Sequence, residues 1–379
     1  MLRVGPLFLY TKDFVMDDLE TSRKKINQID QQIAVLFEQR MDAAKNVALY
    51  KKQYGLQIFD SSREQEILKK EVELINNPDY KPYYLEFIQD LMDVSKKYQS
   101  VLIQGSRIAY CGIEGAWANI AAKRIFPKGN MVSFSSFNQA YEAVVKGECD
   151  FAVLPVENSF AGDVSQVFDL MHTGPLFING MYNLHISQAL LGVKGARLSD
   201  IKKVISHQQA IDQCTEFLQK MGFEVEAAVN TAMAARGVAE ANDKSVAAIA
   251  SVESAELYGL EVLEEGINQN ALNTTRFAVF STVMNKQLNP KSNTVFQMMF
   301  TVKNNPGSLA QAIKTFGDAG VNLKSLRSRP IKDVPWQYYF YVEGEGSMLS
   351  DKGLQLIEAL KKDCEEVKVL GHYDGEVNI

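Results

Sequence analysis

The sequence has few cysteines and no paired ones. Its 379 residues include only Cys111, Cys149, Cys214 and Cys364, and no two of them form a CxxC pair. This scatter gives neither a disulfide framework nor the spacing of a metal site. It is typical of reduced thiols in a cytoplasmic protein. We therefore expect a cytoplasmic protein without a metal or another cofactor.

Long apolar runs and an excess of basic residues are also missing. No stretch is long enough to span a bilayer, so we expect no membrane partner. The 40 Lys and Arg residues face 46 Asp and Glu residues, and the net charge of −6 argues against nucleic-acid binding. Clustered cations are therefore interpreted as local sites for small anions. Residues 1–15 read as an extension to which we assign no function.

The longest regular pattern runs from Leu19 to Tyr54 and predicts one amphipathic helix. It has no Gly or Pro before Gly55, and apolar residues recur near the helical period at Ile26, Ile29, Ile33, Leu36, Phe37, Ala44 and Val47. Arg40 and Lys51 share a face, whereas Arg23 is turned about 100° away and lies about 25 Å from Arg40. One small ligand cannot touch both arginines of a straight helix. A second, antiparallel copy could bring its Arg23 beside Arg40, which predicts a dimer with shared anion sites.

Two further helices are predicted at about 61–76 and 81–99, and no strand pattern precedes residue 101. An all-helical unit over residues 16–104 has a thin core, which dimerisation would enlarge. Taken singly, each of its cations is more often a solvated surface charge. As a set, its polar residues can hold a small dicarboxylate through charge-assisted hydrogen bonds; they are Arg40, Lys51, Asp60, Arg63, Glu64, Ser95 and Gln99.

Strand and helix patterns alternate over residues 105–285 and predict an α/β unit with a mostly parallel sheet. Polar groups stand at predicted strand ends, the usual place for a site in such sheets: Glu157-Asn158, Ser206-His207, Ser251 and Thr274-Thr275. His207 suits a general acid or base and suits a structural role about equally well. A structural ion pair is likewise the alternative to a ligand contact for Arg276. The polar residues 286–293 are interpreted as a linker. Residues 294–379 then show a β-α-β-β-α-β pattern, which predicts a ferredoxin-like domain.

The helical unit resembles the all-helical chorismate mutases. The matching residues are Arg23-x-x-Ile26-x-x-x-Asp30, Arg40, Lys51, Asp60-x-x-Arg63-Glu64 and Ser95-x-x-x-Gln99. The resemblance implies an intertwined dimer that rearranges chorismate to prephenate. It implies that Arg40 and Arg63 of one chain and Arg23 of the other hold the carboxylates, beside Asp60. Lys51 and Gln99 would contact the ether oxygen, Glu64 the ring hydroxyl, and Ser95 a carboxylate.

Residues 106–281 resemble the prephenate dehydratases. The landmarks include Gly112-x-x-Gly115, Pro155-Val156-Glu157-Asn158-Ser159, Ser206-His207-x-Gln209, Gln213-Cys214 and Asn273-x-Thr275-Arg276-Phe277. The resemblance implies two α/β lobes with prephenate in the cleft between them. Prephenate would lose its hydroxyl and its ring carboxylate there, giving phenylpyruvate. Thr275 would serve the leaving hydroxyl, Arg276 would anchor a carboxylate, and the cleft would be lined by Glu157, Asn158, Ser206 and Gln213. The chain departs from the family at Ala116-Trp117-Ala118-Asn119, where a hydroxyl residue usually follows the aromatic one.

The last domain resembles the ACT regulatory domain. Gly307-Ser308-Leu309-Ala310 stands where that family has Gly-Ala-Leu-Val, and Arg327-Ser328-Arg329-Pro330 where it has Glu-Ser-Arg-Pro. The resemblance implies phenylalanine binding at a dimer interface, with feedback inhibition, through Gly307, Ser308, Leu309, Ser328 and Arg329. Arg327 reverses a charge there, and a purely structural ACT domain is the alternative.

Together these resemblances identify the chain as a member of the bifunctional chorismate mutase/prephenate dehydratases, forming a homodimer or a tetramer. Two alternatives stay open. One is a two-lobed protein that binds small anions and has lost catalysis, against which Lys51, Gln99 and Thr275 argue. The other is arogenate as the dehydratase substrate, although the attached mutase favours prephenate.

Overall fold

The computed structural model describes residues 19–54, 61–285, 293–332 and 334–379. The expected extension at 1–15 lies outside these ranges, as do Asp60 and nearly all of the expected linker at 286–293. The chain forms two compact units, residues 1–105 and 106–379, and each is described by itself. None of the helices in the described ranges is long and apolar enough to cross a membrane.

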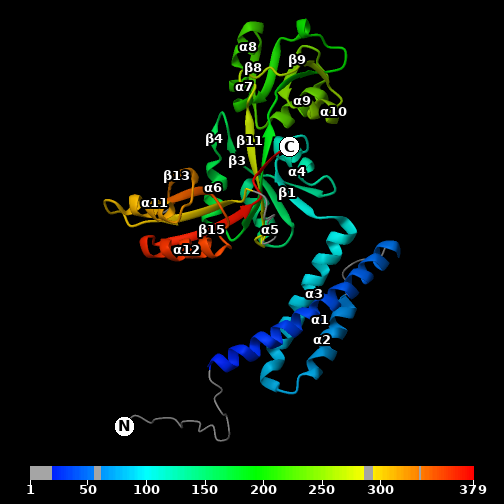
Figure 1. Cartoon of the computed structure of the whole chain (residues 1–379). Helices are drawn as coiled ribbons and strands as arrows, with labels where there is room; N and C mark the ends of the chain where they lie inside the picture. Colours follow the sequence, from blue (N-terminus) through cyan, green and yellow to red (C-terminus); the bar gives the residue numbers. More distant parts are fainter. Residues whose placement is uncertain (1–18, 55–60, 286–292, 333) are drawn as a thin grey trace, which may run out of the picture. The chain divides into compact units, whose positions relative to one another are not determined.

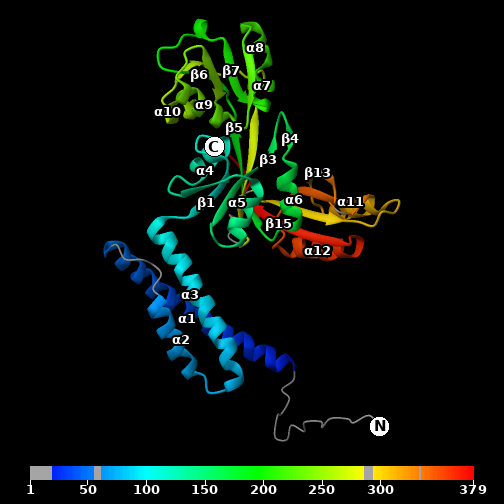
Figure 2. The ribbon, with the colours of Figure 1, turned by 180° about the vertical axis from the view of Figure 1, so that it is seen from behind.

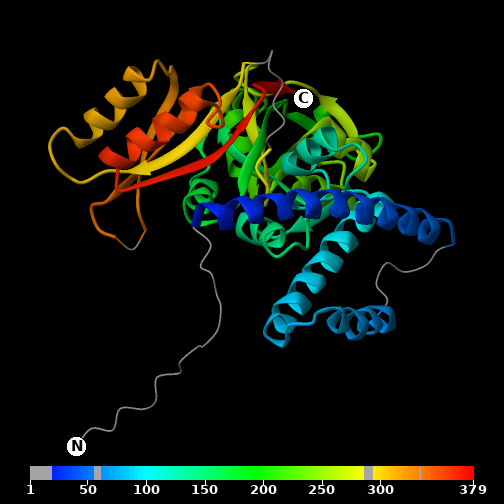
Figure 3. The same cartoon turned by 60° about the horizontal axis from the view of Figure 1, so that its bottom comes forward.

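The first unit is helical, as predicted. Helix α1 runs from Leu19 to Tyr54 without a break (Figure 3). Helix α2 (Ser61–Glu71) continues into the short 3-10 turns η1 (Val72–Leu74) and η2 (Pro78–Tyr80), and helix α3 spans Lys81–Gln104. Helix α3 passes its expected end at Gln99 because no breaker occurs before Gly105, which has a φ of 81° and donates its N–H to Val101.

The core of this helical unit is thin. Its buried apolar residues are Ala48, Ile88 and Met92. A large part of the apolar stripe of α1 is exposed in the single chain, namely Ile26, Ile29, Ile33, Leu36, Phe37 and Val47. The expected thin core is therefore present, and this stripe is available to cover another surface.

The second unit begins with an α/β lobe. We define the first lobe by the strands β1 (Arg107–Cys111), β2 (Asn130–Phe134), β3 (Phe151–Asn158), β4 (Gly162–Asp163), β5 (Phe177–His185) and β11 (Thr274–Ser281). Its helices are α4 (Trp117–Ile125), α5 (Phe137–Val145) and α6 (Ser165–Thr173). The strands β1, β2 and β3 are parallel, whereas β11 runs antiparallel to both β3 and β5.

A second lobe is inserted between β5 and β11 (Figures 1 and 2). Its sheet has the order β10-β6-β9-β7-β8, with β6 (Ala189–Gly192), β7 (Lys203–His207), β8 (Glu224–Ala228), β9 (Val246–Ala250) and β10 (Glu261–Glu264). Its helices are η3 (Leu198–Asp200), α7 (Gln208–Gln213), α8 (Thr215–Met221), α9 (Thr231–Ala241) and α10 (Val252–Tyr258). Two connecting segments, at about residues 186–188 and 267–273, join the lobes. They form backbone hydrogen bonds with each other. The predicted α/β architecture is confirmed, but the expected mostly parallel sheet is wrong, because both lobes have mixed sheets: β11 runs antiparallel to its neighbours in the first lobe, and β6 does so in the second.

The C-terminal domain, residues 295–379, has the strand order β13-β14-β12-β15 with antiparallel neighbours. Its elements are β12 (Val295–Thr301), α11 (Ser308–Asp318), β13 (Leu323–Pro330), β14 (Tyr338–Glu345), α12 (Asp351–Asp363), β15 (Glu366–Tyr373) and β16 (Glu376–Asn378). Helices α11 and α12 lie on the same face of the sheet (Figure 3). This order of elements and strands is the ferredoxin-like one.

The sheets of the first lobe and the C-terminal domain are joined into one of eleven strands. Strand β15 meets β5 where Gly371 pairs with Ile178, and β16 then runs parallel to β5. A Cβ on Gly371, whose φ is 153°, would overlap the carbonyl oxygen of Ile178. The glycine therefore permits the close approach of the two strands. The sequence pattern predicted two separate sheets, and this junction was not foreseen.

Candidate active sites

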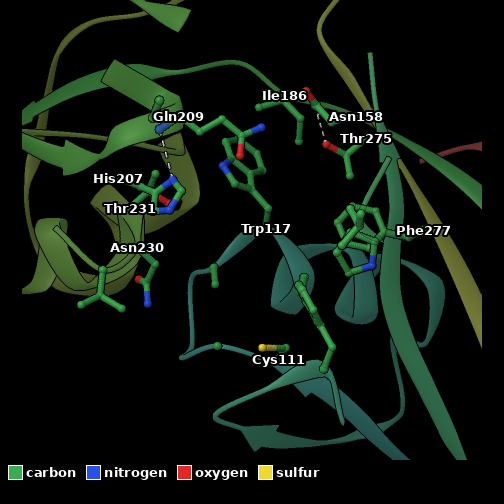
Figure 4. A pocket seen from close by; sticks show the side chains of 18 of the residues that line it. Cys111, Trp117, Asn158, Ile186, His207, Gln209, Asn230, Thr231, Thr275 and Phe277 are labelled. Carbon is green, nitrogen blue, oxygen red and sulfur yellow. Dashed lines mark hydrogen bonds between the residues drawn. The ribbon is translucent and has the colours of Figure 1, made fainter. Parts of the chain in front are cut away.

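A cavity of about 540 Å³ lies between the two lobes of the second unit (Figure 4). Its polar lining comes from both lobes: Ser135, Asn158 and Thr275 from the first, and His207, Gln209, Gln213, Asn230 and Thr231 from the second. Ile186 and Gln188, in one of the segments that connect the lobes, also line the cavity. A ligand in this cavity would thus contact both lobes and the connection between them.

The first lobe supplies a hydrogen-bonded pair to this cavity. The Asn158 side-chain amide donates to Thr275 Oγ1 at 2.9 Å and to Asn273 Oδ1 at 2.9 Å. Its oxygen accepts from the backbone N–H groups of Phe160 and Ala161. Because Thr275 Oγ1 accepts from Asn158, the threonine O–H remains available to donate to a ligand.

Two buried amides meet at the connection between the lobes. Gln188 Nε2 donates to Gln213 Oε1 at 3.1 Å, and the side-chain oxygen of Gln188 is buried without a hydrogen-bond partner. A buried acceptor left unpaired is costly and suggests a ligand donor. Gln213 was predicted as a site residue, whereas Gln188 was missed. The only feature of the sequence that points to Gln188 is its side-chain amide next to the apolar residues of β6.

Three predicted cleft residues do not line the cavity. Ser206 is fully buried and donates to the carbonyl oxygen of Ile249 at 2.6 Å, which joins β7 to β9. Glu157 and Arg276 pair with each other at 3.1 Å. They point away from the cavity because successive residues of a strand alternate between its faces, and their neighbours Asn158 and Thr275 point toward it.

The described residues that line the cavity include no Lys, Arg, Asp or Glu. His207 accepts from the backbone N–H of Gln209 through Nδ1 at 3.3 Å. Burial raises the pKa of the Cys111 thiol. The starts of α4, α7 and α9 all contribute lining residues. Helix starts present free N–H groups and partial positive charge, so they suit carboxylate groups. No cluster of metal ligands occurs among the residues that the structure describes.

In the helical unit, α1 and α3 bring together part of the predicted set. The Arg40 guanidinium donates to Ser95 Oγ and to the carbonyl oxygen of Leu91. Burial lowers the pKa of Arg40, although the charge of Glu71 opposes this. Ser95 is buried, and Gln99 is buried with its side-chain oxygen unpaired.

Two other predicted residues of this unit pair with residues outside the predicted set. Glu64 pairs with Lys96 at 2.8 Å, and Arg63 pairs with Glu66 at 2.7 Å. Lys51 is half-buried on α1, and Arg23 is exposed on an earlier part of the same helix. A groove of about 580 Å³ between α1 and α3 is mainly apolar, and Arg40 is the one member of the set that lines it.

Known proteins resemble both units. Family models match at residues 108–285, for prephenate dehydratase, and at residues 22–100, for type II chorismate mutase. The arogenate dehydratase/prephenate dehydratase 2 of Arabidopsis thaliana is 33% identical, over 70% of this chain and 72% of that protein. The bifunctional chorismate mutase/prephenate dehydratase of Buchnera aphidicola subsp. Acyrthosiphon pisum is 28% identical, over 93% of this chain and 96% of that protein. The chain belongs to the bifunctional chorismate mutase/prephenate dehydratases.

A solved structure resembles the second unit of this bifunctional enzyme. It is the prephenate dehydratase of Arthrobacter aurescens in complex with L-Phe, which is 26% identical with a TM-score of 0.65. The match covers 71% of this chain and 90% of that one. The helical unit is thus the mutase domain, and the two lobes form the dehydratase domain.

The predicted effector residues of the bifunctional enzyme lie on two elements of the C-terminal domain. Gly307, with a φ of 87°, precedes α11, which begins with Ser308 and Leu309. Ser328 and Arg329 lie on β13, and the guanidinium of Arg329 stands over the ring of Phe168, 5.7 Å from its centre. The atypical Arg327 lies over the same ring, also 5.7 Å from its centre, and pairs with Glu157 at 2.8 Å and with Asp163.

Proposed function

We propose that the dehydratase cavity converts prephenate to phenylpyruvate, with Thr275 serving the leaving hydroxyl. The observation that carries this proposal is the pair of Asn158 and Thr275 at the cavity. Asn158 fixes the threonine oxygen and leaves its O–H free to donate. As the ring carboxylate departs as carbon dioxide, its bonding electrons enter the ring and displace the hydroxyl. The hydroxyl leaves as water with one proton taken up from solvent, and Thr275 donates a hydrogen bond to the departing oxygen and is itself unchanged at the end.

The lining of the cavity supports this chemistry. Because the described residues that line the cavity include no Lys, Arg, Asp or Glu, the cavity replaces water around the departing carboxylate with apolar groups and neutral donors. Because Arg276 does not reach the cavity, we assign the carboxylates to the starts of α4 and α9 and to the amides of Gln188 and Gln213. Ser206 then supports the second-lobe sheet rather than the substrate.

We also propose that the helical unit rearranges chorismate to prephenate in a site shared by two chains. The hydrogen bond between Arg40 and Ser95 supports this proposal. Arg23 of a second chain, with Arg63, Asp60 and Glu64, would complete the contacts to the carboxylates and the ring hydroxyl. Lys51 and Gln99 would contact the ether oxygen, and the unpaired oxygen atom of Gln99 is consistent with a ligand there. The exposed stripe of α1 supports a dimer, whose formation would bury it.

Phenylalanine is the proposed effector, and feedback inhibition its effect. The support is the fold of the C-terminal domain and the L-Phe complex of the similar Arthrobacter protein. Gly307, Ser308, Leu309, Ser328 and Arg329 are the proposed contacts. Arogenate is the second candidate substrate, because the Arabidopsis relative is named for both activities. The attached mutase domain favours prephenate.

One assay tests the sequence of reactions. Purified chain given chorismate alone should form phenylpyruvate, followed by its ultraviolet absorbance, and added phenylalanine should slow that formation. Prephenate that accumulates without phenylpyruvate would reject the dehydratase assignment. A comparison of prephenate with arogenate as the starting compound decides between the two substrates.

A further inference from the structure

A cluster of charged side chains lies behind the dehydratase cavity, where the first lobe meets the C-terminal domain. Arg276 on β11 contacts three carboxylates: Glu157 on β3 at 3.1 Å, Glu343 on β14 at 3.0 Å and Glu376 on β16 at 2.6 Å. Arg327 on β13 extends the cluster to Glu157 and to Asp163 on β4. Six side chains from six strands thus converge, three from the first lobe and three from the C-terminal domain.

The cluster is adjacent in sequence to the reacting pair. Thr275 pairs with Asn158 across β11 and β3, and the next pair along these strands is Arg276 with Glu157. The strands alternate, so one pair faces the cavity and the other faces the C-terminal domain. Arg276 and Glu157 are the direct chain neighbours of Thr275 and Asn158, so contacts that fix the backbone at one pair also restrict it at the other.

These contacts differ from ordinary surface ion pairs. The side chain of Glu343 is 3% exposed and that of Arg276 is 18% exposed. Burial disfavours the charge of Arg276, yet Glu343 and Glu376 outweigh that effect and raise its pKa. Burial likewise opposes the charge of Glu157, but Arg327 and Arg276 lower its pKa. Buried pairs of this kind hold a defined geometry, because loss of one partner leaves the other charge unpaired.

We infer that Arg276 and Arg327 are positioning residues for the dehydratase reaction. They hold the strand ends that carry Thr275 and Asn158 against the C-terminal domain, so the placement of that domain sets the geometry of the reacting pair. The inference rests on the proposed dehydratase function. It assigns Arg327 a contact with the first lobe.

The test compares variants of the full chain at the edge of the cluster. Arg327→Met removes the charge, Arg327→Lys keeps it, and Glu376→Gln weakens the contact to Arg276 from another strand. Lys332→Met is the matched control, because Lys332 pairs with Asp169 on α6 at 2.8 Å, which also joins the C-terminal domain to the first lobe but lies off β3 and β11. For each variant, kcat and KM for prephenate are measured, with the melting temperature and the mutase activity.

We expect Arg327→Met and Glu376→Gln to lower the dehydratase kcat by roughly 5- to 50-fold while KM changes less than about 2-fold, since small misplacements of reacting groups are costly. Arg327→Lys should recover most of the activity, and Lys332→Met should match the wild type. Unchanged kcat in both charge-removing variants, or an equal loss in Lys332→Met, would overturn the inference alone. A wild type inactive on prephenate would reject the proposed function and the inference with it. If Arg327→Met does not fold, Glu376→Gln decides.

Discussion

Thr275 is the residue on which the dehydratase proposal depends most. Thr275→Val keeps the shape of the side chain but removes the O–H that faces the ligand. Because proton or hydrogen-bond donation to a leaving group contributes roughly 10²- to 10⁴-fold, we expect the dehydratase kcat to fall by at least about 100-fold. Mutase activity should stay unchanged. Thr275→Ser, which keeps the hydroxyl, is the control, and steady-state kinetics with prephenate is the measurement.

The opposite result is equally clear. If Thr275→Val keeps its dehydratase activity while folded, the donor must be another group, and Asn158 would then be the first to examine. A loss of both activities in a folded variant would contradict two independent sites.

Glu157 gives a prediction about pH. Its folded pKa lies below the ordinary value of 4.5, since Arg327 and Arg276 outweigh the effect of burial. The unfolded chain therefore binds the proton more readily, and the ionised group stabilises the fold above about pH 4.5. That contribution is lost as the pH falls through the lower, folded pKa. We expect the melting temperature of the wild type to exceed that of Glu157→Gln at pH 7, and the difference to shrink toward pH 3. A difference that stays constant over this range would contradict the pairing.

For individual residues, the sequence predicted which ones are important more reliably than it predicted the directions of their side chains. Asn158, Gln213 and Thr275 do line the cavity. The assignment of both Thr275 and Arg276 to one cleft conflicts with the two-residue period of a strand, and the same holds for Glu157 and Asn158. The two-residue period alone argues against placing both members of either pair in the same cleft. Gln188 had no comparable signal, because its role depends on contacts between distant segments.

Helix α1 tests the shared mutase site. Arg23 and Arg40 lie on one helix and are separated by about 25 Å along its axis, so each site should draw them from different chains. We expect Arg23→Ala and Arg40→Ala proteins to lack mutase activity and to retain dehydratase activity. Each mixed dimer of the two variants contains one site with both arginines intact, so it should have at most about half the activity of a normal dimer. An equal mixture with random subunit exchange, in which about half of the dimers are mixed, should recover at most about a quarter of normal activity. The absence of any recovery in verified mixed dimers would contradict the shared site.

The helical elements were the part of the fold that the sequence predicted most closely. Helix α1 has the expected bounds because about six turns of apolar periodicity, from Ile26 to Val47, continue with no Gly or Pro before Gly55. The predicted helix α3 ended five residues too early. Val101, Leu102 and Ile103 favour a strand locally, yet they continue the helix to Gly105. Local preference alone cannot decide such an end.

The joined sheet couples the C-terminal domain to the dehydratase lobes at the scale of the whole second unit. Gly371→Ala would place a methyl group against the Ile178 carbonyl at the junction. Because an alanine in this backbone region is strained, we expect at least about 1 kcal/mol of destabilisation, measured as a lower melting temperature and a lower denaturant midpoint. Gly317→Ala is the control, since it lies in α11 with open space around its Cβ position, and alanine should there be neutral or favourable by up to about 1 kcal/mol. Equal stability of the two variants would contradict a tight junction.

The sequence could not predict this junction, because β16 has three residues and its partner β5 lies almost two hundred positions earlier. Strand patterns specify alternation within a strand and carry little information about which distant edge it joins. The α/β alternation and the ferredoxin-like order followed from local patterns, and the two lobes followed from the family resemblance. The join between the first-lobe sheet and the sheet of the C-terminal domain depends on the close contact at Gly371 and on the pairing of β16 with β5.

The lining of the dehydratase cavity determines how substrate binding there should depend on ionic strength. Its described residues hold no Lys or Arg, so a dianion bound there depends on short-range amide, hydroxyl and backbone donors, whereas the proposed mutase site uses arginines at a helix surface. Dissolved salt largely screens the interaction between exposed charges that are separated by more than about 10 Å at 0.1 M salt, or by more than about 3 Å at 1 M. One chain should therefore show two responses to added sodium chloride: a KM for chorismate that rises several-fold and a KM for prephenate that changes less than about 2-fold. Equal rises in the two constants would mean that an arginine or lysine reaches the dehydratase cavity when substrate is bound.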